Sequence, residues 1–293
     1  MSGAPSTVIT DLPAAVHAAP PGRPGALRAW LAAMPQTLHA EWTKLRTVSG
    51  TFWLLAGVVA ATLAVSVAAV AATKCTTGLG CPADTTKLSL TGVYLGQAVV
   101  AILAVLAVSN EYSTGMIRVT LAAMPRRLAV LAAKAAIAGA LVLAAGAVAV
   151  AGSLLAGRLL LPGNGFTAAH GFAVLSLAHG PTLRAACGSV LYLALIALLS
   201  LGIATAVRDS AVAIGLSLGL LYLPPILIAL TVSSPVWLHR LQRYTPMTAG
   251  LTIQNTTGSH GLPITPWAGL GVLALWAAAA LLIGGLLLRL RDA

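Results

Sequence analysis

Six long apolar stretches, separated by short polar segments, set the pattern of this chain. Each stretch is about 18 residues or longer, the length that a helix needs to cross about 30 Å of hydrocarbon. Inside a bilayer such a stretch must satisfy its own backbone hydrogen bonds, so we expect helices. A membrane β-barrel is excluded, because its strands would be about ten residues long with alternating polarity. The expected spans are residues 52–72, 91–109, 130–156, 185–207, 211–232 and 267–288.

The first 48 residues follow a different pattern. Residues 1–25 mix Pro, Ala, Gly and Ser without periodicity, which indicates a flexible tail. Residues 26–48 place their apolar side chains in one stripe at helical spacing, which predicts an amphipathic helix in the membrane interface. Glu41 falls near this stripe and needs either a basic partner, Lys44 or Lys134, or an outward path to the headgroups. The side chains expected at headgroup depth are Trp30, Glu41, Trp42, Lys44 and Arg46.

A polar island lies between the second and third apolar stretches. It runs from Ser109 to Arg118 and is closed by Pro125. Ser113 or Thr114 can cap a short new helix, which Pro125 would end. The alternative is a solvated loop whose arginines only set the membrane topology.

Composition agrees with a polytopic membrane protein. Charged residues make up 8% of the chain and hydrophobic residues 58%, with a mean hydropathy of +0.93. These values exclude an ordinary soluble domain. The net charge of +11 would suit a nucleic-acid partner, but the basic residues are scattered at the ends of apolar stretches. We therefore expect a lipid bilayer, and no nucleic acid, as the partner of these charges.

The distribution of lysines and arginines predicts the topology. With the N-terminus in the cytoplasm, eleven of the 17 basic residues fall on cytoplasmic segments, which agrees with the positive-inside rule. The eleven are Arg23, Arg28, Lys44, Arg46, Arg118, Arg126, Arg127, Lys134, Arg208, Arg289 and Arg291. The other six are Lys74, Lys87, Arg158, Arg184, Arg240 and Arg243. Both termini of a multi-pass protein of the cell membrane are thus expected in the cytoplasm.

The sequence contains few residue patterns that indicate a catalytic or metal-binding site. The phosphate-binding pattern Gly-x-x-x-x-Gly-Lys followed by Ser or Thr is absent, so we expect no enzyme and no cofactor in this chain. The histidines lack local ligand spacing, which argues against a metal site. No carboxylate lies within an expected span, which disfavours a proton relay.

Cysteines, prolines and glycines mark three further features. Cys75 and Cys81 flank a glycine-containing turn in the first outer loop, where they either form a disulfide or remain free thiols. Pro224 and Pro225 remove two backbone donors from the fifth span, so a kink or break is expected there. In the same span, small residues four positions apart, Gly215 and Gly219, would suit a helix contact or arise by chance.

Five short motifs follow one another along the chain. They are Glu41 to Arg46, Ser109 to Arg118, Arg126-Arg127, Tyr244 to Gly250 and Arg289 to Ala293. In this order and spacing they resemble the permease subunits of ABC-2 type exporters, particularly those of actinobacteria. The resemblance covers about residues 38 to 293.

The resemblance implies a six-span permease domain over residues 49–293, with residues 26–48 as the interfacial elbow helix. It implies that residues 111–124 form the coupling helix that contacts a separate ATPase subunit, and that residues 233–266 form an outer hairpin or a shallow re-entrant segment. The coupling residues would be Glu111, Tyr112, Ser113, Thr114, Gly115, Met116 and Arg118.

The implied partners are two ATPase subunits and a second permease, either an identical copy or a similar chain. The substrate path would lie between the two permeases. A competing hypothesis from another class is a non-transporting membrane anchor or sensor that positions a soluble partner. A membrane-embedded enzyme is disfavoured by the shortage of catalytic groups.

Overall fold

The described part of the chain is mostly helical and contains no strand. The computed structural model describes residues 49–75, 84–113, 127–168, 172, 175–231, 235–257, 262 and 264–290. The predicted tail over residues 1–25 and the predicted elbow helix over residues 26–48 lie outside the described residues.

Six helices are long and apolar enough to cross a membrane, which confirms the predicted all-helical class and its six spans. They are α2 (Ser49–Ala72), α4 (Val93–Ser113), α6 (Arg127–Leu160), α7 (Gly180–Val207), α8 (Ser210–Thr231) and α11 (Pro266–Leu290). The largest difference from the predicted bounds is at α7, which begins at Gly180 rather than residue 185. Pro181 lies in its first turn, where a missing N–H and a fixed φ favour helix initiation.

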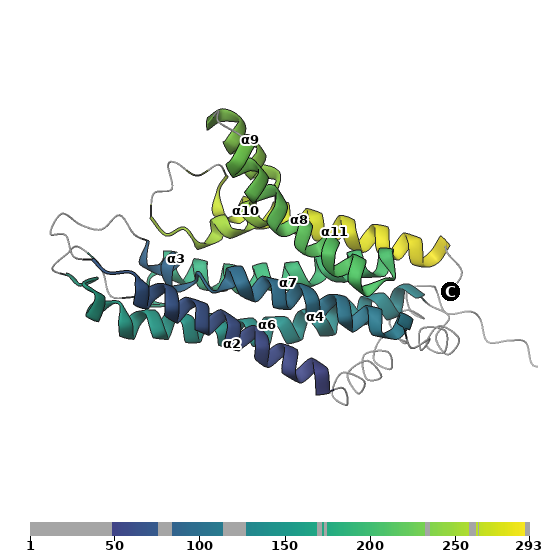
Figure 1. The fold of residues 1–293 in the computed structure, drawn as a ribbon, viewed down its shortest axis with the longest axis horizontal. Helices are drawn as coiled ribbons and strands as arrows, with labels where there is room; N and C mark the ends of the chain where they lie inside the picture. Colours follow the sequence, from purple (N-terminus) through teal and green to yellow (C-terminus); the bar gives the residue numbers. More distant parts are fainter. Residues whose placement is uncertain are drawn as a thin grey trace, which may run out of the picture.

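The six spans run back and forth, so the bundle has two ends (Figure 1). We call the end where α4 finishes and α11 finishes the Ser113 end. The opposite end, where α2 finishes and α7 begins, is the Asp84 end. α7 lies in the centre and packs against α4, α6, α8 and α11, whereas α2, α8 and α11 leave most of their apolar surface exposed. Such exposed apolar surface is what a helix bundle presents to lipid.

Glycines allow the closest helix contacts. A Cβ added to Gly202 on α7 would lie 2.5 Å from the backbone carbon of Ala280 on α11, and one added to Gly284 would lie 2.6 Å from the Gly202 carbonyl oxygen. Lipid tails are as apolar as leucine, so helices in a bilayer gain stability from close backbone packing rather than from hydrophobic burial alone. The α7–α11 pair is built on this contact.

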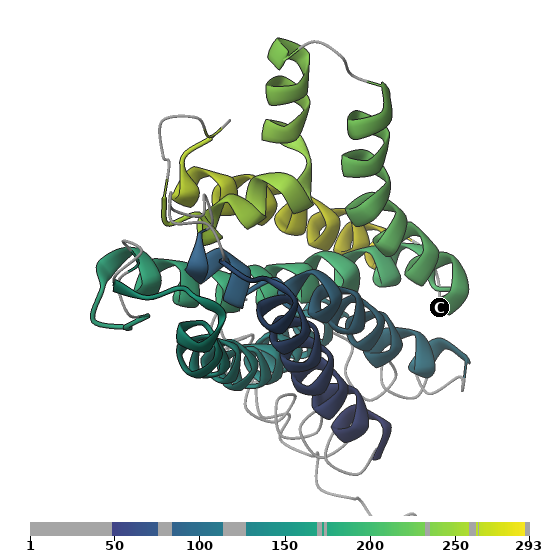
Figure 2. The same ribbon diagram turned by 60° about the vertical axis from the view of Figure 1, so that its left-hand side comes forward.

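Short helices gather at or near the Asp84 end. They are α3 (Thr85–Ser89), η1 (Pro162–Asn164), α9 (Pro235–Tyr244), α10 (Pro246–Leu251) and η3 (Thr252–Gln254). The end of α8 and the whole of α9 project sideways from the bundle (Figures 1 and 2). By contrast α10 and η3, which we call the fold-back segment, return to the bundle and are buried against α7 and α11. In the described part of the 233–266 connection, the fold-back segment thus enters the bundle, as the re-entrant alternative would, rather than staying outside it as a hairpin.

Two predicted local features differ in the structure. α4 does not end at Ser109 but continues to Ser113, so Glu111, Tyr112 and Ser113 extend this helix instead of opening a separate one. No glycine or proline interrupts the chain between Ser109 and Ser113, and polar side chains are tolerated at a helix end. The helix α8 also runs unbroken through Pro224 and Pro225, so the predicted break does not occur. Figure 2 shows this helix changing direction along its length.

Candidate functional site

Four polar side chains are fully buried between α4, α7 and the fold-back segment. We call them the polar network: Gln97, Ser189, Tyr192 and Gln254. Gln97 comes from α4, Ser189 and Tyr192 from α7, and Gln254 from the end of the fold-back segment. Burying an amide or a hydroxyl costs free energy unless a hydrogen bond replaces water, so the contacts of these groups decide whether they are tolerated.

The Gln97 amide is paired at both of its ends. The Tyr192 hydroxyl donates to Gln97 Oε1, and Gln97 Nε2 donates to the sulfur of Met247 at 3.4 Å. Met247 belongs to α10, so this side chain connects α4, α7 and the fold-back segment. A hydrogen bond to sulfur is weak, and the Tyr192 hydroxyl is the stronger of the two partners.

Gln254 is paired at one end only. Its Nε2 donates to Ser189 Oγ at 3.0 Å, while its buried Oε1 has no hydrogen-bond partner among the described residues. An unpaired buried acceptor costs about 1–3 kcal/mol. The oxygen is therefore an available acceptor inside the bundle.

Two glycines make room for the fold-back segment beside α7. A Cβ added to Gly188 would lie 2.0 Å from Ile253 Cγ1, and one added to Gly250 would lie 2.6 Å from Tyr192 Cε2. Any larger residue at either position would push the segment away from α7. The hydrogen bonds that the fold-back segment makes through Met247 and Gln254 depend on this close approach.

Asp84 fastens the chain that follows the fold-back segment. Its carboxylate accepts hydrogen bonds from Lys87 N at 3.0 Å, Thr256 N at 2.5 Å, Thr256 Oγ1 at 2.7 Å and Thr257 N at 3.1 Å. Partial burial alone would raise the pKa of Asp84, but these hydrogen bonds outweigh it and hold the pKa below its ordinary value. Next to it, Arg184 donates to the Asn255 carbonyl at 2.6 Å.

A further hydrogen bond ties α8 to α4. The Tyr222 hydroxyl donates to the Tyr94 carbonyl oxygen, one turn of α4 before Gln97. The helices α4, α7 and α8 and the fold-back segment are thus joined by polar contacts in one region of the bundle.

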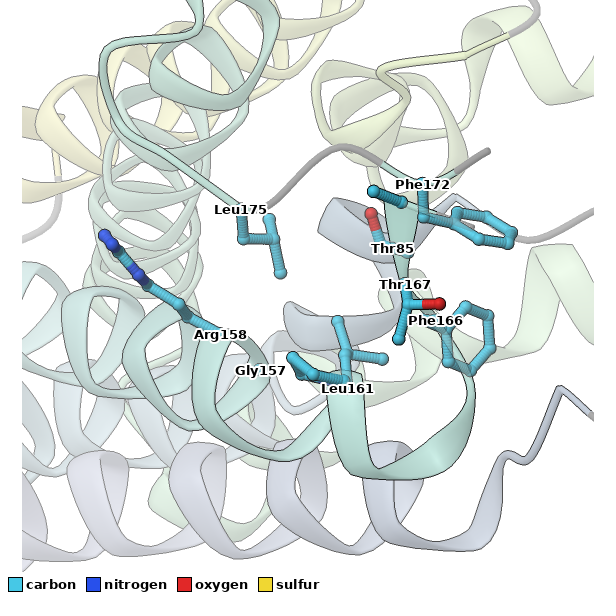
Figure 3. Close-up of a pocket in the computed structure, with 10 residues that line it drawn as sticks. Thr85, Gly157, Arg158, Leu161, Phe166, Thr167, Phe172 and Leu175 are labelled. Carbon is cyan, nitrogen blue, oxygen red and sulfur yellow. The ribbon is translucent and has the colours of Figure 1, made fainter. Parts of the chain in front are cut away.

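A small pocket also lies at the Asp84 end, between α3, α6 and the residues that follow η1 (Figure 3). Its volume is about 140 Å³, room for about five water molecules at about 30 Å³ each. The rings of Phe166 and Phe172 meet edge to face with centroids 5.0 Å apart, and the Arg158 guanidinium points away from them in Figure 3. The pocket is too small for a bulky cargo, so we give it no transport role.

Most of the side chains predicted as functional lie outside the described residues. These are Thr114, Gly115, Met116 and Arg118 of the coupling segment, and Trp30, Glu41, Trp42, Lys44 and Arg46 of the elbow helix. The backbone of Glu111, Tyr112 and Ser113 forms the end of α4. Cys75 is disulfide-bonded, but Cys81 lies outside the described residues, so their pairing stays a prediction.

The sequence interpretation missed the polar network and the role of Asp84. The available signal was Gln97, an amide in the middle of the second apolar stretch, because such residues rarely occur in spans without a partner. Its partners could not be read from the sequence, since Tyr192 and Met247 lie far along the chain.

The fold and the polar network together define a multi-pass helical membrane protein with a fold-back segment held inside its bundle. No family model matches the chain, and no curated protein matches it.

Proposed function

We propose that this chain is the membrane-spanning permease subunit of an ABC-2 type exporter, and that a separate ATPase subunit supplies the energy. The observation that carries the proposal is the polar network. An anchor needs only apolar helices, and burying two glutamines and a tyrosine between α4, α7 and the fold-back segment gives it no advantage. A transporter uses such contacts to couple helix movement to the opening of a path.

The continuity of α4 supports a mechanical route. The helix runs unbroken from Val93 to Ser113, so Glu111 and Gln97 lie on one rigid element about 21 Å apart along its axis at about 1.5 Å per residue. A push on the segment after Ser113 would shift Gln97, and with it Tyr192 and Met247. Closure of the ATPase would thereby act on the fold-back segment.

The connections at the Ser113 end support the same assignment. α7 and α8 are joined only by Arg208 and Asp209, with Arg208 in the left-handed region at a φ of 66°. Such a tight turn offers little surface for docking. The connection between α4 and α6, residues 114–126, is much longer, and we assign it the contact with the ATPase.

The test is transport by two coupling variants, Glu111→Ala and Gly115→Pro, in reconstituted vesicles with the partner ATPase and a panel of candidate cargoes. We expect both to abolish transport or ATPase association and to leave membrane insertion intact. Asp209→Asn is the matched control, because it removes a carboxylate from the same end and keeps an oxygen that can cap α8 as Asp209 does. Normal transport by both coupling variants would show that the coupling assignment is wrong.

The anchor or sensor hypothesis makes a different prediction. A neighbouring reading frame with a phosphate-binding loop would encode the ATPase that the exporter requires. If the purified chain neither binds nor stimulates that ATPase, the anchor explains the data and the exporter is rejected.

A further inference from the structure

An apolar groove runs along α8 on the side that α9 closes. Its volume is about 890 Å³. Leucines such as Leu223 form its walls, Gly215 and Gly219 form part of its floor, and Leu241 and Thr245 belong to α9 and the residue after it. Among the described residues that line the groove, Thr245 alone has a polar side chain.

The two floor glycines keep the groove open. A Cβ added to Gly215 would meet no atom within 4 Å, and one added to Gly219 would come no closer than 3.5 Å to Leu223 of the same helix. Neither glycine is therefore needed for α8 to pack on the described helices. From Val212 to Ile228 the groove follows about 24 Å of helix, more than the roughly 15 Å of one hydrocarbon leaflet.

The wall formed by α9 is basic at its outer surface. Arg240 and Arg243 are exposed, and α9 contains no acidic residue. The Arg240 guanidinium lies 5.4 Å from the centre of the Trp237 ring, and Trp237 is 58% exposed. Neither guanidinium has an ion-pair partner in the part of the chain that the structure describes. Tryptophan beside arginine is typical of headgroup depth in a membrane.

We propose that the groove of α8 and α9 binds one anionic phospholipid. Its acyl chain would lie along the floor formed by Gly215 and Gly219, and its phosphate would lie at the rim of the groove beside α9, within the electrostatic range of Arg240 and Arg243. The inference is independent of the ATPase and of any cargo.

Charge complementarity favours a lipid over a second copy of this chain. Among the described residues, Asp84 carries the one carboxylate at the Asp84 end. This carboxylate already accepts four hydrogen bonds. Asp209 lies at the opposite end, where it caps α8. The described residues of a second copy therefore offer these arginines no available carboxylate at their depth, whereas each anionic phospholipid brings a phosphate.

The full chain, purified in detergent after reconstitution with phosphatidylglycerol and phosphatidylcholine, allows the test. We expect native mass spectrometry to find phosphatidylglycerol retained in preference to phosphatidylcholine. In the double variant Arg240→Gln and Arg243→Gln, retention of phosphatidylglycerol should fall about tenfold, since each surface arginine adds to the binding of an anionic lipid. Arg158→Gln is the matched control, because Arg158 is an exposed arginine that lines the small pocket at the Asp84 end instead of the groove.

A second variant tests the floor separately. Gly219→Leu fills the groove, so it should reduce the retention of both lipids; Gly215→Leu serves if the first variant does not fold. Equal retention of the two lipids by the wild type, or unchanged retention in the double arginine variant, overturns the proposal. If Gly219→Leu separates a dimer and leaves lipid retention unchanged, a second copy occupies the groove and the lipid assignment is wrong.

Discussion

At the scale of single residues, the two buried glutamines of this bundle each pair with a side chain from another element. Gln97 lies within an apolar helix, and Tyr192 and Met247 bind the two ends of its amide. Gln254 donates to Ser189, and its oxygen accepts no hydrogen bond from the described residues. Cys187, by contrast, has a free thiol and is exposed on α7 although it lies within a span. Whether a residue within a span is buried depends on the helix face that carries it. A continuous hydrophobic stretch in the sequence does not reveal which face packs against other helices.

Asp84 gives a prediction for pH dependence. Because the pKa of Asp84 in the folded protein is below its ordinary value of 3.8, the ionised carboxylate stabilises the fold at neutral pH. This contribution should be fully present above the ordinary value and lost as the pH falls through the lower folded value. Asp84→Asn should therefore lower the melting temperature at pH 7, and the difference from the wild type should shrink below about pH 4.

Thermal unfolding in detergent between pH 3 and pH 7 would measure this effect. Asp209→Asn is the comparison, because Asp209 accepts one hydrogen bond where Asp84 accepts four, so its loss at pH 7 should be smaller. A difference between Asp84→Asn and wild type that stays constant across the whole range would contradict the assigned role of the charge.

At the scale of elements, α7 organises the bundle and α8 stands at its edge. α7 makes close backbone contact with α11 at Gly202 and receives the fold-back segment at Gly188. α8 carries Gly215 and Gly219, the pair that the sequence pattern singled out, yet no other described helix packs on them. The helical spacing of Gly215 and Gly219 thus marked a groove and not a helix contact. The glycines at which helices pack closely, such as Gly202, lie on other helices.

The difference between these two kinds of glycine can be measured. Gly202→Ala should lower the free energy of unfolding by about 1–3 kcal/mol, because the new methyl group meets the α11 backbone. Gly215→Ala should have no cost, or increase stability by up to about 1 kcal/mol through its higher helix propensity. Unfolding in mixed micelles would compare the two. Equal stability of both variants would mean that α7 and α11 do not approach as closely as described.

At the scale of the whole molecule, the six spans place different structural features at the two ends of the bundle. The Asp84 end holds α3, the disulfide-bonded Cys75 and the hydrogen bonds of Asp84. The Ser113 end holds the last turn of α4, the tight α7–α8 turn and the end of α11. The basic residues predict that the Ser113 end faces the cytoplasm.

Cysteine labelling in intact cells tests that topology. In a Cys187→Ser background, a membrane-impermeant maleimide should label His179→Cys at the Asp84 end and leave Asp209→Cys at the Ser113 end unlabelled; both residues are exposed. Both variants should be labelled after the membrane is permeabilised. The reverse pattern in intact cells would invert the proposed orientation. The background chain should react only after reduction if Cys75 and Cys81 are paired.

The number, length and order of the spans were determined by the sequence alone, because crossing a bilayer depends on local apolar length and on backbone hydrogen bonds within one helix. Which residues pair with each other when they lie far apart along the chain was decided only by the tertiary structure. Thr256 reaches Asp84 across 172 residues, and Tyr192 reaches Gln97 across 95. These pairs depend on which helix faces meet and on the glycines that let them approach, and neither leaves a periodic signal in the sequence. The buried fold-back segment and the groove of α8 and α9 therefore became visible only once the helices were packed.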